Sequence, residues 1–409
     1  MVRRWLVFVV LVAGCRAGSL DWPQWGGPHG NFKSDATGLA SVWPAAGPKK
    51  LWSRALGEGY SGISVDGDVL YTMYRTGNDE VILAAAASTG KTIWEYRYDA
   101  RFRSGMGMEN GSGPHATPLV TENGIYAIGI LGNLVCLNKQ TGKKVWSHDL
   151  YGEYRATVFD RGWAPSPMVY GNLMIMKIGG AGHSLVAFDQ KSGSPVWKTA
   201  RNFANAPASP LLINVDGQDQ LAAAMADDVV GIDPHDGSVL WSYPHSTSWG
   251  LNISTPVWGA GNLLFISSAY NGGSAVIRLT RSGGKTTASE VWTSNRVRVH
   301  FSTAVRVGDM VYGSSGDFGP APLTAVDVKT GKIAWQDRSF PKANFVYADG
   351  KFIVVDEDGT VSLANFTPQG LKVLSRAALL HSNAWTAPSV ARGRLYLRDR
   401  KDMMALDLH

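Results

Sequence analysis

Cysteine is nearly absent from this chain, and its scarcity sets the first limits on the protein. Only Cys15 and Cys136 occur among 409 residues. Cys15 lies in an expected targeting segment, so its removal or lipidation would leave no partner for a disulfide. Cys136 takes the place of an alanine in the repeat described below, and we expect a small buried core residue there rather than a nucleophile.

Charged residues are also scarce, at 18% of the chain, and the formal net charge is +6. Lysine and arginine form no long run, so the sequence offers no basic segment of the kind that tracks a phosphate backbone. We therefore expect no nucleic-acid partner.

Local catalytic and metal-binding motifs are missing as well. The nine histidines are scattered, and neither His-Glu-x-x-His nor Gly-x-Ser-x-Gly occurs. Residues 105–110 fall short of a dinucleotide-binding fingerprint. Residues 356–359 (DEDG) lie between valine-rich runs, which favours a hairpin turn over a calcium loop. We expect no metal site, and no catalytic residue is predicted.

The apolar stretch at residues 5–12 is about half as long as a bilayer-spanning helix. It follows Arg3 and Arg4, so residues 1–19 are predicted to be a signal peptide rather than a membrane helix. Residues 11–15 (LVAGC) resemble a bacterial lipobox, in which Cys15 becomes lipidated. Ordinary cleavage after Ala17 would instead discard Cys15.

These two alternatives imply an exported protein. A lipidated Cys15 would make it a periplasmic or outer-membrane-anchored lipoprotein that meets the membrane only through its lipid. Cleavage without lipidation would make it secreted.

The feature that organises the rest of the chain is the segment AVDVKTGKIAW at residues 325–335. Glycine accepts a positive φ at no steric cost, so Thr-Gly suits a tight turn between two strands. Versions of this segment recur, each ending on tryptophan or a substitute. Those positions are 52, 94, 146, 197, 241, 292, 335 and, with leucine, 374. A period of about 45 residues with strand signals predicts a β-propeller.

A second series of turns agrees with the first. Asn-Gly, Asp-Gly and related pairs occur once per repeat, each between short apolar runs. They lie at residues 66–67, 123–124, 171–172, 216–217, 261–262, 308–309, 349–350 and 392–393.

The two ends of the repeat region predict how the ring closes. The last copy stops at residues 405–407 without its tryptophan strand, whereas the first tryptophan strand, near residues 50–56, has no preceding partner. Pairing these two pieces removes an open sheet edge. We predict an all-β chain in which residues 49–409 form a single eight-bladed β-propeller with four-stranded blades. Residues 20–48 are predicted to be an irregular extension whose tryptophans pack on the outside or underside. We expect a monomer.

The Ala-x-Asp-x-x-Thr-Gly-x-x-x-Trp copies resemble the repeats of pyrroloquinoline-quinone (PQQ)-type propellers. This superfamily includes quinoprotein alcohol dehydrogenases and BamB-like exported propellers of bacteria. The resemblance covers about residues 49–408 and implies the fold; it leaves the activity open, because function on a shared fold depends on the site.

The resemblance to quinoprotein enzymes implies a cofactor site of their kind. In those enzymes, a quinone is held at the ring centre between a tryptophan and two adjacent cysteines, beside a calcium ion. This sequence has no Cys-Cys pair and no Cys-x-x-Cys-His haem site. We therefore expect neither bound PQQ nor calcium.

A ligand site is expected where each repeat enters its innermost strand, because these segments approach the central channel and carry polar and aromatic side chains. The alternative is that they only satisfy backbone groups around a water-filled channel. The candidate ligand-binding residues are His115, Trp163, Asn205, Asn252, His300, Asn344, Asn383 and Trp385.

Three functions fit these observations. The first is an exported, non-catalytic, BamB-like propeller that binds envelope proteins or a small polar ligand. The second is a cofactor-dependent oxidoreductase of the quinoprotein type. The third is a polysaccharide-binding propeller, for which exposed tryptophans would be suitable.

Overall fold

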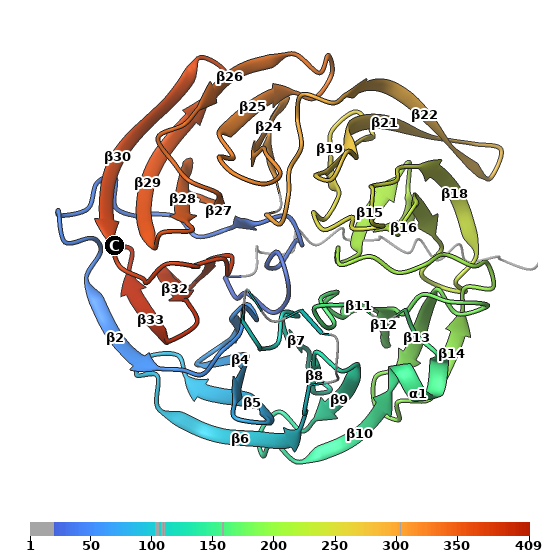
Figure 1. The fold of residues 1–409 in the computed structure, drawn as a ribbon, viewed down its shortest axis with the longest axis horizontal. Helices are drawn as coiled ribbons and strands as arrows, with labels where there is room; N and C mark the ends of the chain where they lie inside the picture. Colours follow the sequence, from blue (N-terminus) through green and yellow to red (C-terminus); the bar gives the residue numbers. More distant parts are fainter. Residues whose placement is uncertain (1–19, 103–105, 108, 110, 158, 303) are drawn as a thin grey trace, which may run out of the picture.

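The computed structural model describes residues 20–102, 106–107, 109, 111–157, 159–302 and 304–409. The predicted signal peptide and the candidate lipidation site Cys15 lie outside the described residues. The described chain forms a ring of eight blades around a central axis (Figure 1). The prediction of an all-β, eight-bladed propeller is confirmed.

Each blade contains four consecutive antiparallel strands, numbered from the centre outward, apart from the last blade, whose outer strand is β2. Blades one to four consist of β3 (Ser64–Asp66), β4 (Val69–Thr76), β5 (Asp79–Ala86) and β6 (Thr92–Asp99); β7 (Leu119–Val120), β8 (Ile125–Ile128), β9 (Asn133–Leu137) and β10 (Lys144–Asp149); β11 (Met168–Tyr170), β12 (Leu173–Lys177), β13 (Leu185–Asp189) and β14 (Pro195–Lys198); and β15 (Leu211–Val215), β16 (Gln218–Ala224), β17 (Asp228–Ile232) and β18 (Val239–Pro244).

The second half of the ring repeats this pattern. Blades five to eight consist of β19 (Val257–Gly259), β20 (Leu263–Ser268), β21 (Gly273–Ser282) and β22 (Lys285–Ser294); β23 (Val305–Val307), β24 (Met310–Ser314), β25 (Leu323–Asp327) and β26 (Ile333–Asp337); β27 (Ala343–Ala348), β28 (Lys351–Asp356), β29 (Thr360–Thr367) and β30 (Gly370–Ala378); and β31 (Ser389–Ala391), β32 (Arg394–Arg398), β33 (Asp402–Asp407) and β2 (Lys50–Ala55).

The outer strand of blade eight comes from the other end of the chain. Strand β2 pairs antiparallel with β33, with Trp52 opposite Ala405 and Ser53 opposite Met404. Without β2, the edge of β33 would present unpaired backbone groups.

A single short helix, α1 (Leu150–Tyr154), is assigned among the described residues, after blade two. The Asp149 side chain caps its first turn by accepting hydrogen bonds from the backbone N–H groups of Tyr151 and Gly152. No helix in the described ranges has the length and apolarity needed to cross a membrane.

In six of the eight blades, the repeated tryptophan hydrogen-bonds to the next blade; Trp241 instead donates to Gln220 of its own blade, and blade seven has no tryptophan at this position. On β10, the Trp146 indole N–H donates to the carbonyl of Gln190 at 3.1 Å, and its ring lies so close to Gly193 that a Cβ there would meet it at 2.6 Å. The glycine of the repeat is therefore needed both for the turn and for this contact. Equivalent bonds run from the indoles of Trp52, Trp94, Trp197, Trp292 and Trp335 to the carbonyls of Ala87, Lys139, Pro234, Val328 and Thr367.

Local contacts also explain the aspartate and the alanine of the repeat. Asp189 accepts hydrogen bonds from the backbone N–H groups of Lys191 and Ser192, which fixes the turn. Ala187 lies directly opposite Trp197 in the strand register, where a β-bulge leaves room for the indole.

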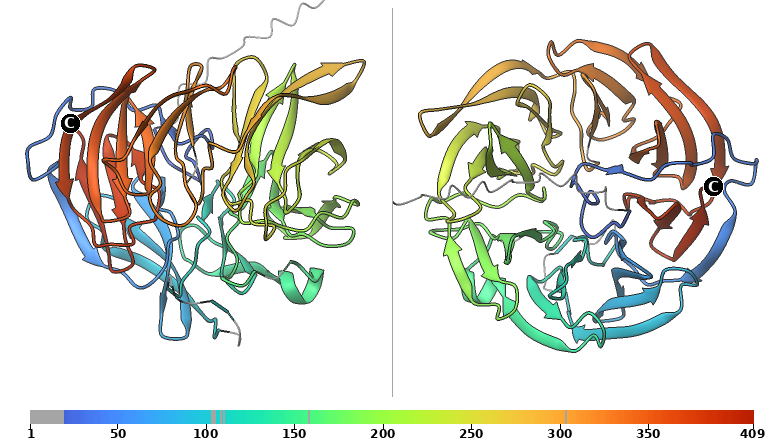
Figure 2. Two further views of the ribbon diagram at one scale, coloured as in Figure 1. Left: turned by 45° about the horizontal axis from the view of Figure 1, so that its top comes forward. Right: turned by 180° about the vertical axis from the view of Figure 1, so that it is seen from behind.

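The N-terminal extension does not stay outside the ring. Figure 2 (right) shows this segment crossing the back of the propeller into its centre. The Leu20 carbonyl accepts from the Arg392 N–H, and Trp22 forms a bridge with Val65 on β3. The segment includes β1 (Lys33–Ser34), which pairs parallel with the inner strand β27.

Only Trp43, of the three tryptophans in the extension, lies against an outer strand, where its backbone N–H donates to the Ser375 hydroxyl on β30. Of the two expected locations, outside or underside, Trp22 and Trp25 do not take the outside one. Both side chains lie in an apolar cluster toward the centre of the ring. Trp22 is 2% exposed, and Trp25 contacts Phe32 edge to face.

Candidate functional site

A cavity of about 520 Å³ lies at the centre of the ring. Entry segments of seven blades line it, and Trp25 of the N-terminal extension closes it from the side of the hairpin turns. The Trp25 indole N–H is fixed by the Thr255 hydroxyl at 3.1 Å. Its described lining includes Trp25, Tyr60, His115, Asp160, Arg161, Asn205, Ser209, Trp249, Tyr270, Phe301 and Trp385.

The entry segments are held by polar side chains near the end of the second strand of the preceding blade. Ser267 accepts from the Val299 N–H at 2.8 Å, and Ser314 accepts from the Ala343 N–H at 2.9 Å. Arg398, fully buried, donates to the Gly59 carbonyl at 2.9 Å. These bonds make the cavity wall part of the interface between blades.

Lys177 makes the same connection between blades three and four. Its buried ammonium donates to the carbonyls of Ala206, Ala208 and Ala224. Burial lowers the pKa of Lys177 to about 7, while the three carbonyl acceptors favour its charged form. Because all three donors are used within the blades, Lys177 is a structural residue rather than a free base.

An aromatic wall forms one side of the cavity. Tyr60 stacks on His115 with ring centroids 5.8 Å apart, and on Trp385 at 5.4 Å. Phe301 continues the band, 5.3 Å from Trp385. Four blades thus supply one nearly continuous ring surface.

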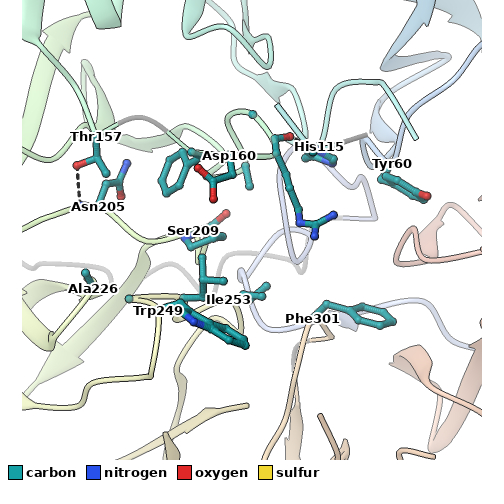
Figure 3. Close-up of a pocket in the computed structure, with 18 of the residues that line it drawn as sticks. Tyr60, His115, Thr157, Asp160, Asn205, Ser209, Ala226, Trp249, Ile253 and Phe301 are labelled. Carbon is teal, nitrogen blue, oxygen red and sulfur yellow. Dashed lines mark hydrogen bonds between the residues drawn. The ribbon is translucent and has the colours of Figure 1, made fainter. Parts of the chain in front are cut away.

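A polar wall faces this band. Figure 3 shows Thr157, Asp160, Asn205 and Ser209 on the side of the cavity away from Tyr60 and Phe301. Asn205 donates to the Lys177 carbonyl and accepts from the Ala206 N–H, so its amide is largely used within the fold. The carboxylate of Asp160 has no hydrogen-bond or ion-pair partner among the described residues, and the residue is exposed.

The two histidines near the cavity are kept neutral by burial. Desolvation lowers the pKa of His115, whose Nε2 lies 2.9 Å from the Arg161 carbonyl and therefore carries the proton. Burial, with Lys342 nearby, lowers the pKa of His300 to about 4. His300 Nε2 lies 2.5 Å from the Tyr270 hydroxyl. Burial also raises the pKa of the Tyr270 hydroxyl, so this contact joins two neutral groups.

Three of the eight candidate ligand-binding residues line the cavity: His115, Asn205 and Trp385. His300 and Asn344 stand behind the wall; the Asn344 amide donates to the Trp385 carbonyl at 2.8 Å. These contacts position cavity residues but leave the two side chains outside the lining.

The other three candidates are placed elsewhere. Trp163 is fully buried, and its indole donates to the Pro165 carbonyl. Asn252 is 1% exposed and bonds to Met225, His245 and Ser268. Asn383 adopts a left-handed turn conformation at φ 64°. For Trp163 and Asn252, the bonds within the fold explain the residue types at these entry segments.

Sequence reasoning missed most of the aromatic lining. Tyr60, Trp249 and Phe301 lie in or beside entry segments, but aromatic residues there resemble core residues in the sequence. Tyr270 comes from a loop between strands of blade five, and Trp25 from outside the repeats. No sequence spacing relates these residues, because the ring brings them together from distant repeats.

One further cluster consists of His381, Asp399 and Asp402, whose potential ligand atoms lie close together. Asp399 is 1% exposed and accepts hydrogen bonds from the backbone N–H groups of His381, Lys401 and Asp402. These bonds account for the carboxylate as part of a turn.

The fold defines the class: an eight-bladed propeller of PQQ-type repeats with a cavity at the ring centre. Residues 78–337 match the family described as outer membrane protein assembly factor BamB. The match covers more than half of the chain, which therefore belongs to this family. The resemblance drawn from the repeats is confirmed.

Relatives of two kinds share this fold. The outer membrane protein assembly factor BamB of Xanthomonas campestris is 24% identical over 386 residues, covering 79% of this chain and 87% of that protein. Quinoprotein alcohol dehydrogenase PedH of Pseudomonas putida is 26% identical over 165 residues, covering 38% of this chain and 25% of that enzyme. The solved quinohemoprotein alcohol dehydrogenase of Comamonas testosteroni superposes with a TM-score of 0.68 at 14% identity, covering 96% of this chain and 81% of that one, and shows the fold alone.

The described lining does not fit PQQ with calcium. PQQ carries three carboxylates, whereas Arg161 is the single lysine or arginine among the described lining residues, and it already pairs with Glu109. Calcium takes six to eight oxygen ligands. The lining offers the Asp160 carboxylate and an Asn205 oxygen that already accepts a backbone N–H. Cys136, which could not form an adjacent pair, is buried in the core of blade two.

Proposed function

We propose that this protein is an exported propeller of the bacterial envelope that works by binding, without catalysis, and holds a ligand in its central cavity. The observation that carries the proposal is the cavity itself. Its two walls combine stacked aromatic rings with polar groups, the composition typical of small-molecule sites.

The chemistry of the lining supports binding over catalysis. Acid–base or nucleophilic catalysis needs a reactive group within hydrogen-bond reach of a base. Among the described lining residues, His115 bonds to a backbone carbonyl and is held neutral, and Asp160 touches neither a histidine nor a hydroxyl by hydrogen bond. Tyr270 also lines the cavity and lies 2.5 Å from His300 Nε2, but burial raises the pKa of the Tyr270 hydroxyl and so keeps it protonated. Among the described lining residues, the arrangement therefore provides contact surface and hydrogen bonds rather than an activated nucleophile.

Export is supported by the predicted signal peptide and by the BamB-named relatives. The same names point to envelope assembly proteins as partners, which the outer surface of the ring and its loops would contact. The lipobox-like residues 11–15 within the predicted signal support lipidation of Cys15, and that lipid would hold the protein at the outer membrane.

The test is a thermal-shift and calorimetric screen of the purified mature protein against a chemically diverse ligand library. We expect saturable binding at about one ligand per chain, weakened by Phe301→Ala and unaffected by Ile93→Ala, which changes an exposed position on β6. In parallel, the protein is mixed with PQQ, calcium, an alcohol and a redox dye. Dye reduction would replace the proposal with an oxidoreductase function.

A further inference from the structure

The mouth of the cavity carries an exposed aromatic group that continues the wall outward. Trp249 lines the cavity and is 61% exposed, and Phe318, 76% exposed, lies 6.2 Å from it. Tyr270 packs against both, at 5.0 Å and 5.6 Å. Phe318 is the most exposed large apolar side chain among the described residues, and Trp249 equals Val42 as the next. An exposed apolar group of this kind, next to a cavity, marks an interaction site.

The cavity therefore offers flat apolar surfaces inside and at its mouth. Rings of this kind bind ligands that present a flat apolar face, and they lose little conformational entropy in doing so. The row from Tyr60 through Trp385 and Phe301 is the inner surface, while Trp249 and Phe318 form the outer one.

The polar wall narrows the choice of ligand. Arg161 donates N–H groups, and the Asp160 carboxylate has no hydrogen-bond partner within the described part of the chain; they are consecutive residues of one entry segment. A purely apolar ligand would remove water from the Asp160 carboxylate without replacing its hydrogen bonds, which is costly. A highly anionic ligand would meet one arginine that Glu109 already neutralises.

A neutral ring that bears hydroxyl groups satisfies both walls. The C–H face of a pyranose sugar is apolar and flat enough to pack on an aromatic ring. Its hydroxyls lie at the edge, and each can both donate and accept, as Asp160 and Arg161 together require. The exposed outer aromatics add stacking area beyond the cavity, so the ligand should extend through the mouth.

We propose, building on the function proposed above, that the central cavity binds one end of a neutral oligosaccharide, with one sugar ring inside and further units on Trp249 and Phe318. Asp160 accepts hydrogen bonds from sugar hydroxyls, and Arg161 donates to them. The propeller thereby becomes a glycan-binding module of the envelope or cell surface.

The test is isothermal titration of the purified mature protein with cello-, malto-, xylo- and chito-oligosaccharides of one to six units. We expect at least one series to bind saturably, with affinity rising as units are added. Asp160→Asn and Trp249→Ala should each weaken binding about tenfold or more, since each removes one charged hydrogen bond or one stacking ring. Ile93→Ala is the control for an exposed apolar residue far from the cavity.

Asp160 and Trp249 are both exposed, so these variants should unfold at the parent temperature, which circular dichroism checks. The inference is overturned if no sugar series binds, or if the two variants bind sugars as the parent does. Binding of another ligand class in the cavity, sensitive to Phe301→Ala, would leave the proposed function standing while refuting the glycan. Failure of every ligand in both experiments would refute both.

Discussion

Single tryptophan residues make the main side-chain contacts between neighbouring blades. Trp146 is 9% exposed, stacks near Phe188, and bonds to a carbonyl of the next blade's turn. The Trp146 side chain thus contacts two blades, and the repeated tryptophan packs neighbouring sheets against each other.

Trp146→Ala should lower the free energy of unfolding by about 3–5 kcal/mol, because it removes a large buried aromatic and leaves a cavity. Trp146→Phe keeps part of the packing and loses the indole hydrogen bond, so it should cost less. Urea unfolding measures both. An alanine variant with the parent's midpoint would contradict the assigned contact.

His245 makes stability depend on pH. It is 7% exposed, and burial lowers its pKa from 6.5 to about 4. Between these pH values the unfolded chain binds a proton that the folded chain excludes, so stability falls as the pH drops through this window. The loss is on the order of 3 kcal/mol. His245→Asn should lose less stability between pH 7 and pH 4; an equal loss in urea midpoints would refute this assignment.

At the scale of elements, the N-terminal extension shapes the site. Its tight loop at residues 24–30 places Trp25 under the cavity. Gly27 has a φ of 78°, and a Cβ there would lie 2.6 Å from the Trp22 ring. Since Trp22 is buried against the inner strands, the ring has no room to move aside.

Gly27→Ala should therefore destabilise the protein by about 1–3 kcal/mol through backbone strain, and by more because of the clash. Gly38→Ala is the matched control, with φ 74° and nothing within 4 Å of its added Cβ. Thermal unfolding compares the two variants. Equal effects of the two substitutions would show that the Trp22 contact is unimportant.

The molecule as a whole depends on both ends of the repeat region. Strand β2 covers the edge of β33, and Trp52 then bonds to Ala87 in blade one. The contact between the last and first blades therefore passes through a strand from near the N-terminus.

Replacing residues 50–56 with a Gly/Ser segment of equal length should open this joint. The exposed edge of β33 would pair with other chains, and the contact to blade one would be lost. Light scattering coupled to size exclusion should show oligomers, and the unfolding temperature should drop. A monomer with the parent's stability would argue that the ring stays closed without β2.

The sequence by itself determined the fold, because each repeat carries its own local signals. Turn glycines, the aspartate of the turn and the small residue opposite tryptophan act within a few residues of one another. The weakest copy shows the limit: Leu374, expected in the tryptophan position, falls in the bulge, and Val373 pairs with Ala364 instead. Without an indole to anchor it, that strand's register shifted by one residue.

Only the tertiary structure decided the site. Tyr60, Trp385 and Phe301 come from three distant repeats and meet because the ring closes, while Trp25 reaches them from outside the repeats. Asparagines in the same entry segments, such as Asn252, turned inward to satisfy buried carbonyls. Local sequence fixes which strands form, whereas the packing of eight blades around one axis selects which side chains face the centre.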